Sequence, residues 1–288
     1  MPVNQTQLKA YISLARLDKP VGIYLVLWPA LWALWLAADG WPGWHLLLVF
    51  VFGAMIMRSA GCVINDYADR DFDGHVARTC QRPIASGVIS AKSALVFFMI
   101  LLLAALLLVF SLNISTVFWS LGAVFLAVLY PFMKRHTYWP QAFLGASFAW
   151  AIPLAFVAVT DSSPPASAWL LFAITLIWAL IYDTAYAIGD KEDDLKIGVK
   201  STAILFADKT NFIIAGFQLL MLGLLLLVWQ IFSLGWFSAL SIFIVMLLFI
   251  YHQILLAKQD AKLAFKVFLN NHWVGFVLWL GVVADTSL

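Results

Sequence analysis

The chain has 288 residues, of which 64% are hydrophobic and only 11% are charged, and its formal net charge is +2. A soluble domain carries about 25% charged residues, and no aqueous fold of this length has enough interior to bury so much apolar surface. The composition therefore excludes a soluble enzyme and a disordered or fibrous protein, and the small net charge argues against a nucleic-acid-binding protein.

Hydrophobic segments long enough to cross a membrane recur along the whole chain. A transmembrane helix needs about 20 apolar residues and must satisfy its backbone hydrogen bonds internally. We therefore expect an all-α bundle of nine transmembrane helices, near residues 20–38, 45–64, 92–110, 115–133, 142–160, 168–188, 210–230, 235–257 and 267–284. No soluble segment separates them, so residues 1–288 are expected to form a single domain in the lipid bilayer.

The basic residues indicate how this bundle is oriented. If the nine segments alternate in direction, all 17 Lys and Arg residues fall on the side of the N-terminus and none on the other. Cytoplasmic loops carry an excess of Lys and Arg. The N-terminus is therefore predicted to be cytoplasmic.

A first acidic cluster follows the second predicted helix. Asn65, Asp69 and Asp73 recur every four residues, and Asp66 stands three residues before Asp69. On a helix these intervals place the side chains along one stripe. If the helix continues beyond the lipid, the stripe forms a row of carboxylates on the cytoplasmic side.

A second acidic cluster ends the sixth predicted helix. Asp183, Asp190 and Asp194 are separated by seven and four residues, and Ala187 breaks the row. A similar extension of this helix predicts a second carboxylate row at the same membrane depth. One such cluster is typical of a solvated helix end. Two of similar spacing, in a chain with so few charges, favour a functional site.

The chemistry of these side chains points to a metal and an anion. Carboxylate oxygens are ligands that Mg²⁺ prefers, commonly together with substrate phosphate oxygens. Basic residues surround both clusters and would neutralise the remaining oxygens of a diphosphate; they are Arg70, Arg78, Arg82, Lys134, Arg135, Lys191, Lys196 and Lys200. A lipid diphosphate could lie with its tail among the helices and its head at the cytoplasmic end. The sequence thus favours a membrane enzyme that ionises a lipid diphosphate.

These residues also resemble a known family. GCVINDYADRDFDGHV (residues 61–76) is similar to the first aspartate motif of the membrane-embedded UbiA-type prenyltransferases, Asn-Asp-x-x-Asp-x-x-x-Asp. DKEDD (residues 190–194) is similar to their second motif, Asp-x-x-x-Asp. The segments RLDKPVGIYLVLWPALWAL, RPIASG, LYPFMKRHTYWPQ and YDTAYAIGDKEDDLKIGVKSTAILF resemble the ubiquinone-pathway branch.

The resemblance runs from about Arg16 to the last predicted helix and has definite implications. It implies a central cavity open to the membrane, dependence on Mg²⁺, and location in the bacterial inner membrane with the active site at the cytoplasmic side. The implied reaction transfers a polyprenyl chain from polyprenyl diphosphate to the ring carbon ortho to the hydroxyl of 4-hydroxybenzoate. No obligate protein partner is implied.

The family motifs imply roles for individual acidic residues. Asn65, Asp69 and Asp73 would hold one Mg²⁺, and Asp190 and Asp194 the other. Asp66 would be a further ligand or a partner behind the ligands. Asp183 would be either a ligand or the base that orients the acceptor. The residues expected to act in catalysis are Asp69, Asp183, Asp190 and Arg135.

The basic residues receive roles at the two substrates. We assign Arg70, Lys134 and Lys196 to the diphosphate and Arg135 to the acceptor carboxylate. Arg58 and Arg16 are alternatives for the acceptor, because a lone arginine in or beside a membrane span needs an anionic partner. Two other interpretations stay open: a related enzyme that prenylates a naphthoate, a homogentisate or a haem precursor, and a cation transporter.

Overall fold

The computed structural model of the protein describes residues 5–74 and 79–287, and all regular secondary structure within them is helical. Nine helical segments are long and apolar enough to cross a membrane, which confirms the predicted number for this part of the chain. Seven are single helices: α2 (Val21–Ala38), α3 (Trp44–Asp73), α4 (Ala91–Val109), α5 (Ile114–His136), α8 (Ala166–Ile188), α12 (Trp236–Leu256) and α13 (Ala261–Ser287).

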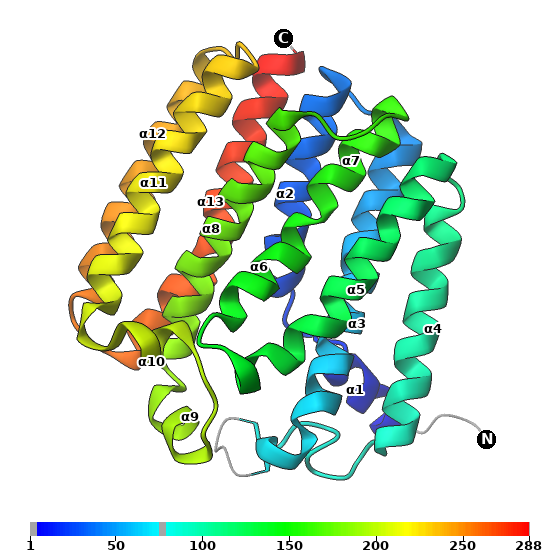
Figure 1. Cartoon of the computed structure of the whole chain (residues 1–288), viewed down its shortest axis with the longest axis vertical. Coiled ribbons are helices and arrows are strands. Elements are labelled where there is room, and N and C mark those ends of the chain that lie inside the picture. Colours follow the sequence, from blue (N-terminus) through cyan, green and yellow to red (C-terminus); the bar gives the residue numbers. More distant parts are fainter. Residues whose placement is uncertain (1–4, 75–78, 288) are drawn as a thin grey trace.

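The remaining elements are shorter or composite. One span joins α6 (Pro140–Ala149) to α7 (Ala151–Thr160), and another joins α10 (Thr202–Phe206) and the 3₁₀ turn η1 (Ala207–Lys209) to α11 (Thr210–Ile231). The helices α1 (Gln5–Leu14) and α9 (Lys191–Ile197) are too short to cross a membrane. Figure 1 shows both at the lower end of the bundle, with the C-terminus at the upper end.

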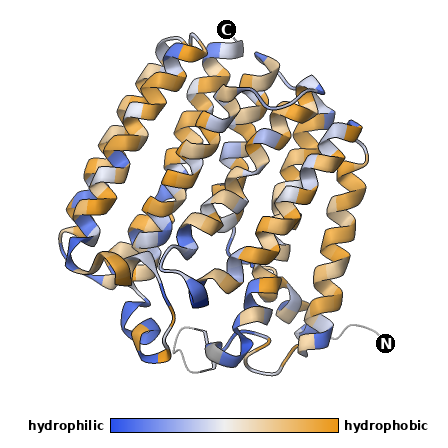
Figure 2. Ribbon diagram, viewed as in Figure 1, coloured by the Kyte–Doolittle hydropathy of each residue, from blue (hydrophilic) through white to orange (hydrophobic). Residues whose placement is uncertain are grey.

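Helices differ in how far they are surrounded by others. In α2 and α8, 61% of the membrane-spanning stretch is buried inside the protein. In α4 and α5, only 17% of that stretch is buried. The first two therefore form the centre of the bundle, and Trp178 and Tyr182 of α8 are among its largest fully buried side chains. The other two lie at the periphery, where their hydrophobic residues face lipid (Figure 2).

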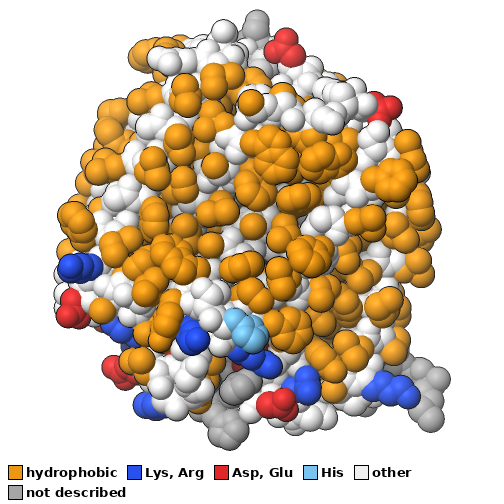
Figure 3. Space-filling view, in the orientation of Figure 1, with side chains coloured by type: hydrophobic (Ala, Val, Ile, Leu, Met, Phe, Trp, Pro, Cys, Tyr) orange, Lys and Arg blue, Asp and Glu red, His pale blue; other side chains and the backbone are white. Residues whose placement is uncertain are grey.

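Charged side chains gather toward one end of the bundle. On the face shown in Figure 3, the Lys and Arg side chains lie in the lower part, and hydrophobic side chains cover the rest. The upper end of this face carries acidic side chains but no basic ones. This asymmetry matches the one-sided distribution of Lys and Arg that the sequence predicts.

The span made of α6 and α7 is interrupted because of a proline. Pro153 stands four residues after Ala149. Proline has no N–H to donate to the carbonyl of Ala149, and its ring crowds that carbonyl. α6 accordingly ends at Ala149 and α7 begins at Ala151. The backbone hydrogen bond that restarts the helix, from Leu154 N to Trp150 O, is long at 3.4 Å. The break lies in the wall of the cavity described below.

The two acidic segments fold differently. α3 continues without interruption to Asp73, so the first predicted carboxylate row does lie on one helix. The second prediction is wrong: α8 ends at Ile188, and Asp190 is the N-cap of the separate helix α9. Glycine is a poor helix former, and Gly189 is the residue at which α8 stops. Asp183 therefore lies on α8, while Asp194 lies on α9.

Candidate active site

Two arginines from other segments hold the carboxylate of Asp66 on α3. Arg16, just after α1, donates to both oxygens, at 3.1 Å from Oδ1 and 2.9 Å from Oδ2. Arg82, from the segment between α3 and α4, also lies 3.1 Å from Oδ1. Since both oxygens of this buried carboxylate are engaged, we expect Asp66 to stand behind the metal ligands. It fastens α1 and the segment after residue 79 to the end of α3.

Arg82 is shared between two carboxylates. Its Nη1 lies 2.9 Å from Oδ2 of Asp73 as well as 3.1 Å from Asp66. Burial alone would lower the pKa of Arg82, but the attraction of Asp66 and Asp73 outweighs burial and raises its pKa above the ordinary arginine value. Arg82 therefore carries its positive charge at every physiological pH.

Asp69 lies at the centre of a hydrogen-bonded chain from α3 to α5. The hydroxyl of Tyr130 donates to Oδ1 of Asn65 at 3.1 Å, and Nδ2 of Asn65 donates to Oδ2 of Asp69 at 3.2 Å. Lys134 forms an ion pair with the same Asp69 oxygen. The other oxygen, Oδ1, is buried and accepts no hydrogen bond from the described residues. An unsatisfied carboxylate oxygen is costly, so this position suits a bound cation.

Basic side chains hold the three buried carboxylates of α3, Asp66, Asp69 and Asp73. Within residues 5–74 and 79–287, no three His, Cys, Asp or Glu side chains are grouped so that they could hold a metal ion. Lys134 and Arg82 contact Asp69 and Asp73. The chemistry of the donors nevertheless fits Mg²⁺, because carboxylate and amide oxygens of Asp69, Asp73 and Asn65 are hard ligands. The buried, unsatisfied oxygen of Asp69 is the structural feature that supports this fit.

Residues of the second acidic segment lie close to α5. The backbone N–H of Lys200, two residues after the C-cap of α9, donates to the carbonyl of Lys134 at 2.9 Å. Lys134 in turn forms the ion pair with Asp69 of the first motif. The two acidic segments are far apart in the sequence, but both contact the C-terminal end of α5. Asp190 and Asp194 are partly buried.

The other predicted basic residues occupy more exposed positions. Arg70 bonds to the carbonyl of Tyr67 at 2.8 Å and lies over its ring. The side chain of Lys196 is 71% exposed and pairs with Asp193 at 3.1 Å. Arg135 is exposed and donates to the carbonyl of Ala68. Arg78 lies outside the described residues.

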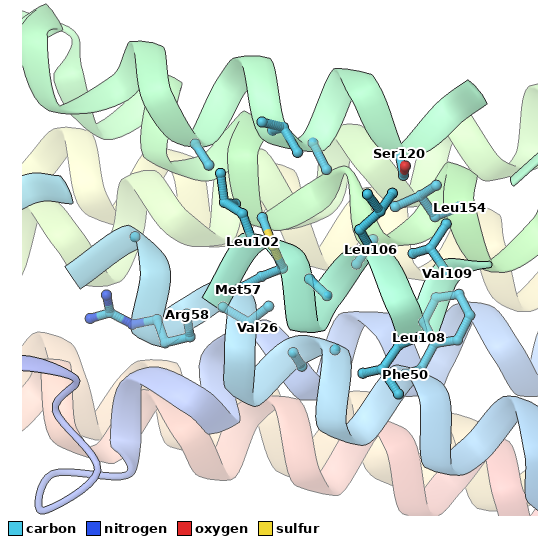
Figure 4. A pocket seen from close by; sticks show the side chains of 18 of the residues that line it. Val26, Phe50, Met57, Arg58, Leu102, Leu106, Leu108, Val109, Ser120 and Leu154 are labelled. Carbon is cyan, nitrogen blue, oxygen red and sulfur yellow. The ribbon is translucent and has the colours of Figure 1, made fainter. Parts of the chain in front are cut away.

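A hydrophobic cavity of about 400 Å³ extends into the membrane region. Figure 4 shows Arg58 at one end of the labelled side chains, with Phe50, Leu108 and Val109 at the other. Met99 and Leu103 of α4 and Leu121 of α5 line the cavity and are also largely exposed. The cavity therefore borders the lipid where these two peripheral helices meet.

Among the described residues, Arg58 is the charged side chain that lines this cavity. Its Nη1 contacts Sγ of Cys62 at 2.7 Å, and its Nε is buried without a hydrogen-bond partner among the described residues. No ion pair joins it to any carboxylate within that part of the chain. A partly buried arginine of this kind is suited to an anionic ligand.

Sequence reasoning did not select two residues that the structure brings into the site. Arg82 was grouped with the surrounding basic residues but received no role, although it is the residue that joins Asp66 to Asp73. Tyr130 was not singled out. It precedes Lys134 by four residues, so both lie on one face of α5, and that spacing was the available signal.

Comparison with known proteins identifies the fold and the family. The model of the UbiA prenyltransferase family matches residues 26–279. The chain belongs to this family. The cation-transport interpretation does not account for this match.

Two curated UbiA relatives are similar over almost their whole length. A 4-hydroxybenzoate octaprenyltransferase of Hydrogenovibrio crunogenus is 58% identical, and the alignment covers 99% of each chain. One from Hahella chejuensis is 52% identical, over 98% of this chain and 93% of the relative.

Solved UbiA structures share the fold. An apo UbiA homolog from Aeropyrum pernix superimposes with a TM-score of 0.80 at 22% identity, over 92% of this chain and 97% of that one. A UbiA homolog from Archaeoglobus fulgidus, solved bound to GPP and Mg²⁺, gives a TM-score of 0.73 at 16% identity, over 96% and 99%. The predicted all-α membrane bundle is thereby confirmed.

Proposed function

We propose that the protein transfers a polyprenyl chain from polyprenyl diphosphate to the ring carbon ortho to the hydroxyl of 4-hydroxybenzoate. The observation that carries this proposal is the relative from Hydrogenovibrio crunogenus, a 4-hydroxybenzoate octaprenyltransferase that is 58% identical over 99% of both chains. The product belongs to ubiquinone biosynthesis. A hydrophobic cavity beside a buried carboxylate cluster supports the same reaction.

Mg²⁺ is the cofactor that the oxygen donors fit. Asn65, Asp69 and Asp73 would hold one ion and Asp190 and Asp194 another. A bound Mg²⁺ neutralises the diphosphate and makes it a better leaving group. The presence of Mg²⁺ with GPP in the Archaeoglobus fulgidus homolog supports this choice of metal.

Basic residues at the cytoplasmic end would hold the diphosphate. Lys134 is poised for this role, because it is only partly exposed and already contacts the central carboxylate, Asp69. Arg82 contributes a permanent charge beside Asp73, which lies one helical turn after Asp69 on α3. Arg70 and Lys196 are more exposed, and we assign them to the outer edge of the head group.

Arg58 is our choice for the acceptor carboxylate. It lines the cavity and is partly buried, whereas Arg135 is exposed and bonds to a backbone carbonyl, and Arg16 is committed to Asp66. We place Asp183 at the acceptor end of the site, because α8 packs against α6, which carries Phe148 beside Arg58. There it would orient the phenol and accept a proton.

The reaction breaks the bond between C1 of the prenyl chain and the diphosphate oxygen. The ring carbon of 4-hydroxybenzoate supplies the electron pair for the new carbon–carbon bond, and that carbon then loses its proton. Apolar side chains of the cavity keep water away from the allylic cation that forms as the diphosphate departs. The prenyl chain remains in the hydrophobic cavity and the adjoining lipid throughout the reaction.

We place the active site on the cytoplasmic side of the bacterial inner membrane. The support is that all 17 Lys and Arg residues fall on the side of the N-terminus when the spans alternate. Diphosphate does not cross a bilayer, so the side on which it is released reports the side of the active site.

One experiment tests the function and the orientation together. Inverted inner-membrane vesicles containing the protein are given octaprenyl diphosphate with an equimolar mixture of 4-hydroxybenzoate, a dihydroxynaphthoate and homogentisate. We expect mass spectrometry to find octaprenyl 4-hydroxybenzoate alone, with diphosphate released outside these vesicles. Prenylated naphthoate or homogentisate instead would refute the assigned acceptor, and diphosphate retained inside the vesicles would refute the orientation.

A further inference from the structure

Gly22, in the first turn of α2, lies directly against the guanidinium of Arg58. A Cβ atom built at Gly22 would stand 2.5 Å from Nε, 2.7 Å from Nη2 and 3.0 Å from Cζ of Arg58. Real Cβ atoms do not approach other atoms to less than about 3.0 Å. Any side chain at this position would therefore displace Arg58.

The three distances also say which part of Arg58 faces Gly22. Cζ is farther from the Cβ position than either nitrogen is. The position therefore lies off the edge of the guanidinium, between Nε and Nη2, and not above its flat face. The bare backbone of Gly22 is what allows this edge to approach α2.

The backbone of α2 does not itself call for a glycine here. Among the described residues, the glycines with positive φ are Gly40, Gly43, Gly87 and Gly198, and Gly22 is not one of them. Alanine is a better helix former than glycine. The space required by Arg58 is therefore the reason that the structure gives for a glycine at position 22.

Cys62 and Phe148 also contact the guanidinium of Arg58. Nη1 lies 2.7 Å from Sγ of Cys62, one turn along α3, and Cζ lies 5.7 Å from the centre of the Phe148 ring. Arg58 thus has Gly22 at its Nε–Nη2 edge, Cys62 at Nη1 and the ring of Phe148 within the range of a cation–π contact. The three neighbours come from α2, α3 and α6.

We propose that Gly22 is a positioning residue for the acceptor: its missing side chain lets Arg58 sit in the cavity wall, where the arginine binds the carboxylate of an aromatic acid. This proposal rests on the proposed function, because it takes Arg58 as the group that binds the acceptor. It adds that the affinity for the acceptor carboxylate is set from α2, by a residue that does not touch the substrate.

The substitution Gly22→Ala tests this directly. We expect the KM for 4-hydroxybenzoate to rise about 10-fold, as for a lost hydrogen bond to a charged group, while the KM for octaprenyl diphosphate stays within 2-fold, about the limit of context effects. Gly216→Ala is the matched control, because its Cβ position on α11 has no atom within 4 Å. An unchanged KM for 4-hydroxybenzoate in Gly22→Ala would overturn the proposal.

A double substitution separates positioning from a general structural effect. In Arg58→Lys, which lacks the Nε–Nη2 edge, adding Gly22→Ala should leave the KM for 4-hydroxybenzoate as it was. A further rise in that background contradicts the proposal, because the effect would not act through Arg58. If Gly22→Ala alone fails to fold, recovery of folding in the double variant supports the clash with Arg58, and failure of both variants contradicts it.

The outcome is distinguishable from failure of the proposed function. A wild-type protein that does not prenylate 4-hydroxybenzoate refutes the function itself before any variant is compared. A wild-type protein that does so, with Gly22→Ala and Gly216→Ala behaving alike, refutes only the role of Gly22.

Discussion

Replacing Asp69 by asparagine is expected to lower kcat for prenyl transfer by at least about 10²-fold, the effect typical of removing one preorganised electrostatic group from an active site. Asp69 is 2% exposed, bonds to Asn65 and Lys134, and has one oxygen without a partner among the described residues. The substitution removes the charge but keeps the size of the side chain. Initial rates with octaprenyl diphosphate and 4-hydroxybenzoate measure the change.

Asp71→Asn is the matched control for this substitution. Asp71 belongs to the same acidic segment, but its side chain is 70% exposed and it pairs only with neighbouring Arg70, at 3.6 Å, among the described residues. An exposed ion pair contributes little, so its loss should leave the rate nearly unchanged. Equal activity of Asp69→Asn and wild type would remove Asp69 from the catalytic site, and equal loss in both variants would point to total charge as the cause.

Arg58→Met is expected to raise the KM for 4-hydroxybenzoate by about 10- to 100-fold, the range for losing a hydrogen bond between charged groups. Methionine retains the apolar stem of the side chain but cannot bind a carboxylate. The KM for octaprenyl diphosphate should stay the same, because the side-chain hydrogen bond of Arg58 among the described residues goes to Cys62 and not to the acidic cluster that would hold the diphosphate. Steady-state kinetics with each substrate varied in turn measures both constants.

A neutral acceptor provides a second reading of the same variant. Wild-type protein should prefer 4-hydroxybenzoate over 4-hydroxybenzamide, and Arg58→Met should lose most of that preference. Arg135→Met is the comparison, since sequence alone favoured Arg135 for this role. A lost preference in Arg135→Met, with Arg58→Met like wild type, would return the acceptor carboxylate to Arg135.

The membrane architecture could be predicted because each span is defined locally. Length and hydropathy of a segment decide whether it crosses the bilayer, and the predicted nine segments are present in the described chain. The four-residue spacing of Asn65, Asp69 and Asp73 likewise indicated one helical face, and α3 does extend through all three.

The same reasoning failed where a local break decided the outcome. Spacing alone suggested one helix through Asp183, Asp190 and Asp194, but α8 stops at Gly189 and α9 begins anew. Pro153 similarly divides the fifth span into α6 and α7. One break occurs at a glycine and the other three residues before a proline, and both of these residues disfavour helix. The sequence therefore contained the signal for each break, although the prediction did not use it.

Contacts between segments far apart in the chain could not be predicted from the sequence. Arg16 and Asp66 are 50 residues apart, and nothing in the spacing selects that partner over another carboxylate. The approach of Gly22 to Arg58 depends in the same way on how α2 packs against α3. Such contacts are set by the packing of whole helices, and they determine which basic residues remain available for substrate.

Binding of inorganic diphosphate in the presence of Mn²⁺, followed by electron paramagnetic resonance, tests most directly whether the two acidic segments act on one head group. Wild-type protein should bind diphosphate only together with the metal. Asp69→Asn on α3 and Asp190→Asn at the start of α9 should each weaken that binding by about 10-fold or more. Wild-type affinity in Asp190→Asn, with binding lost only in Asp69→Asn, would contradict a shared site.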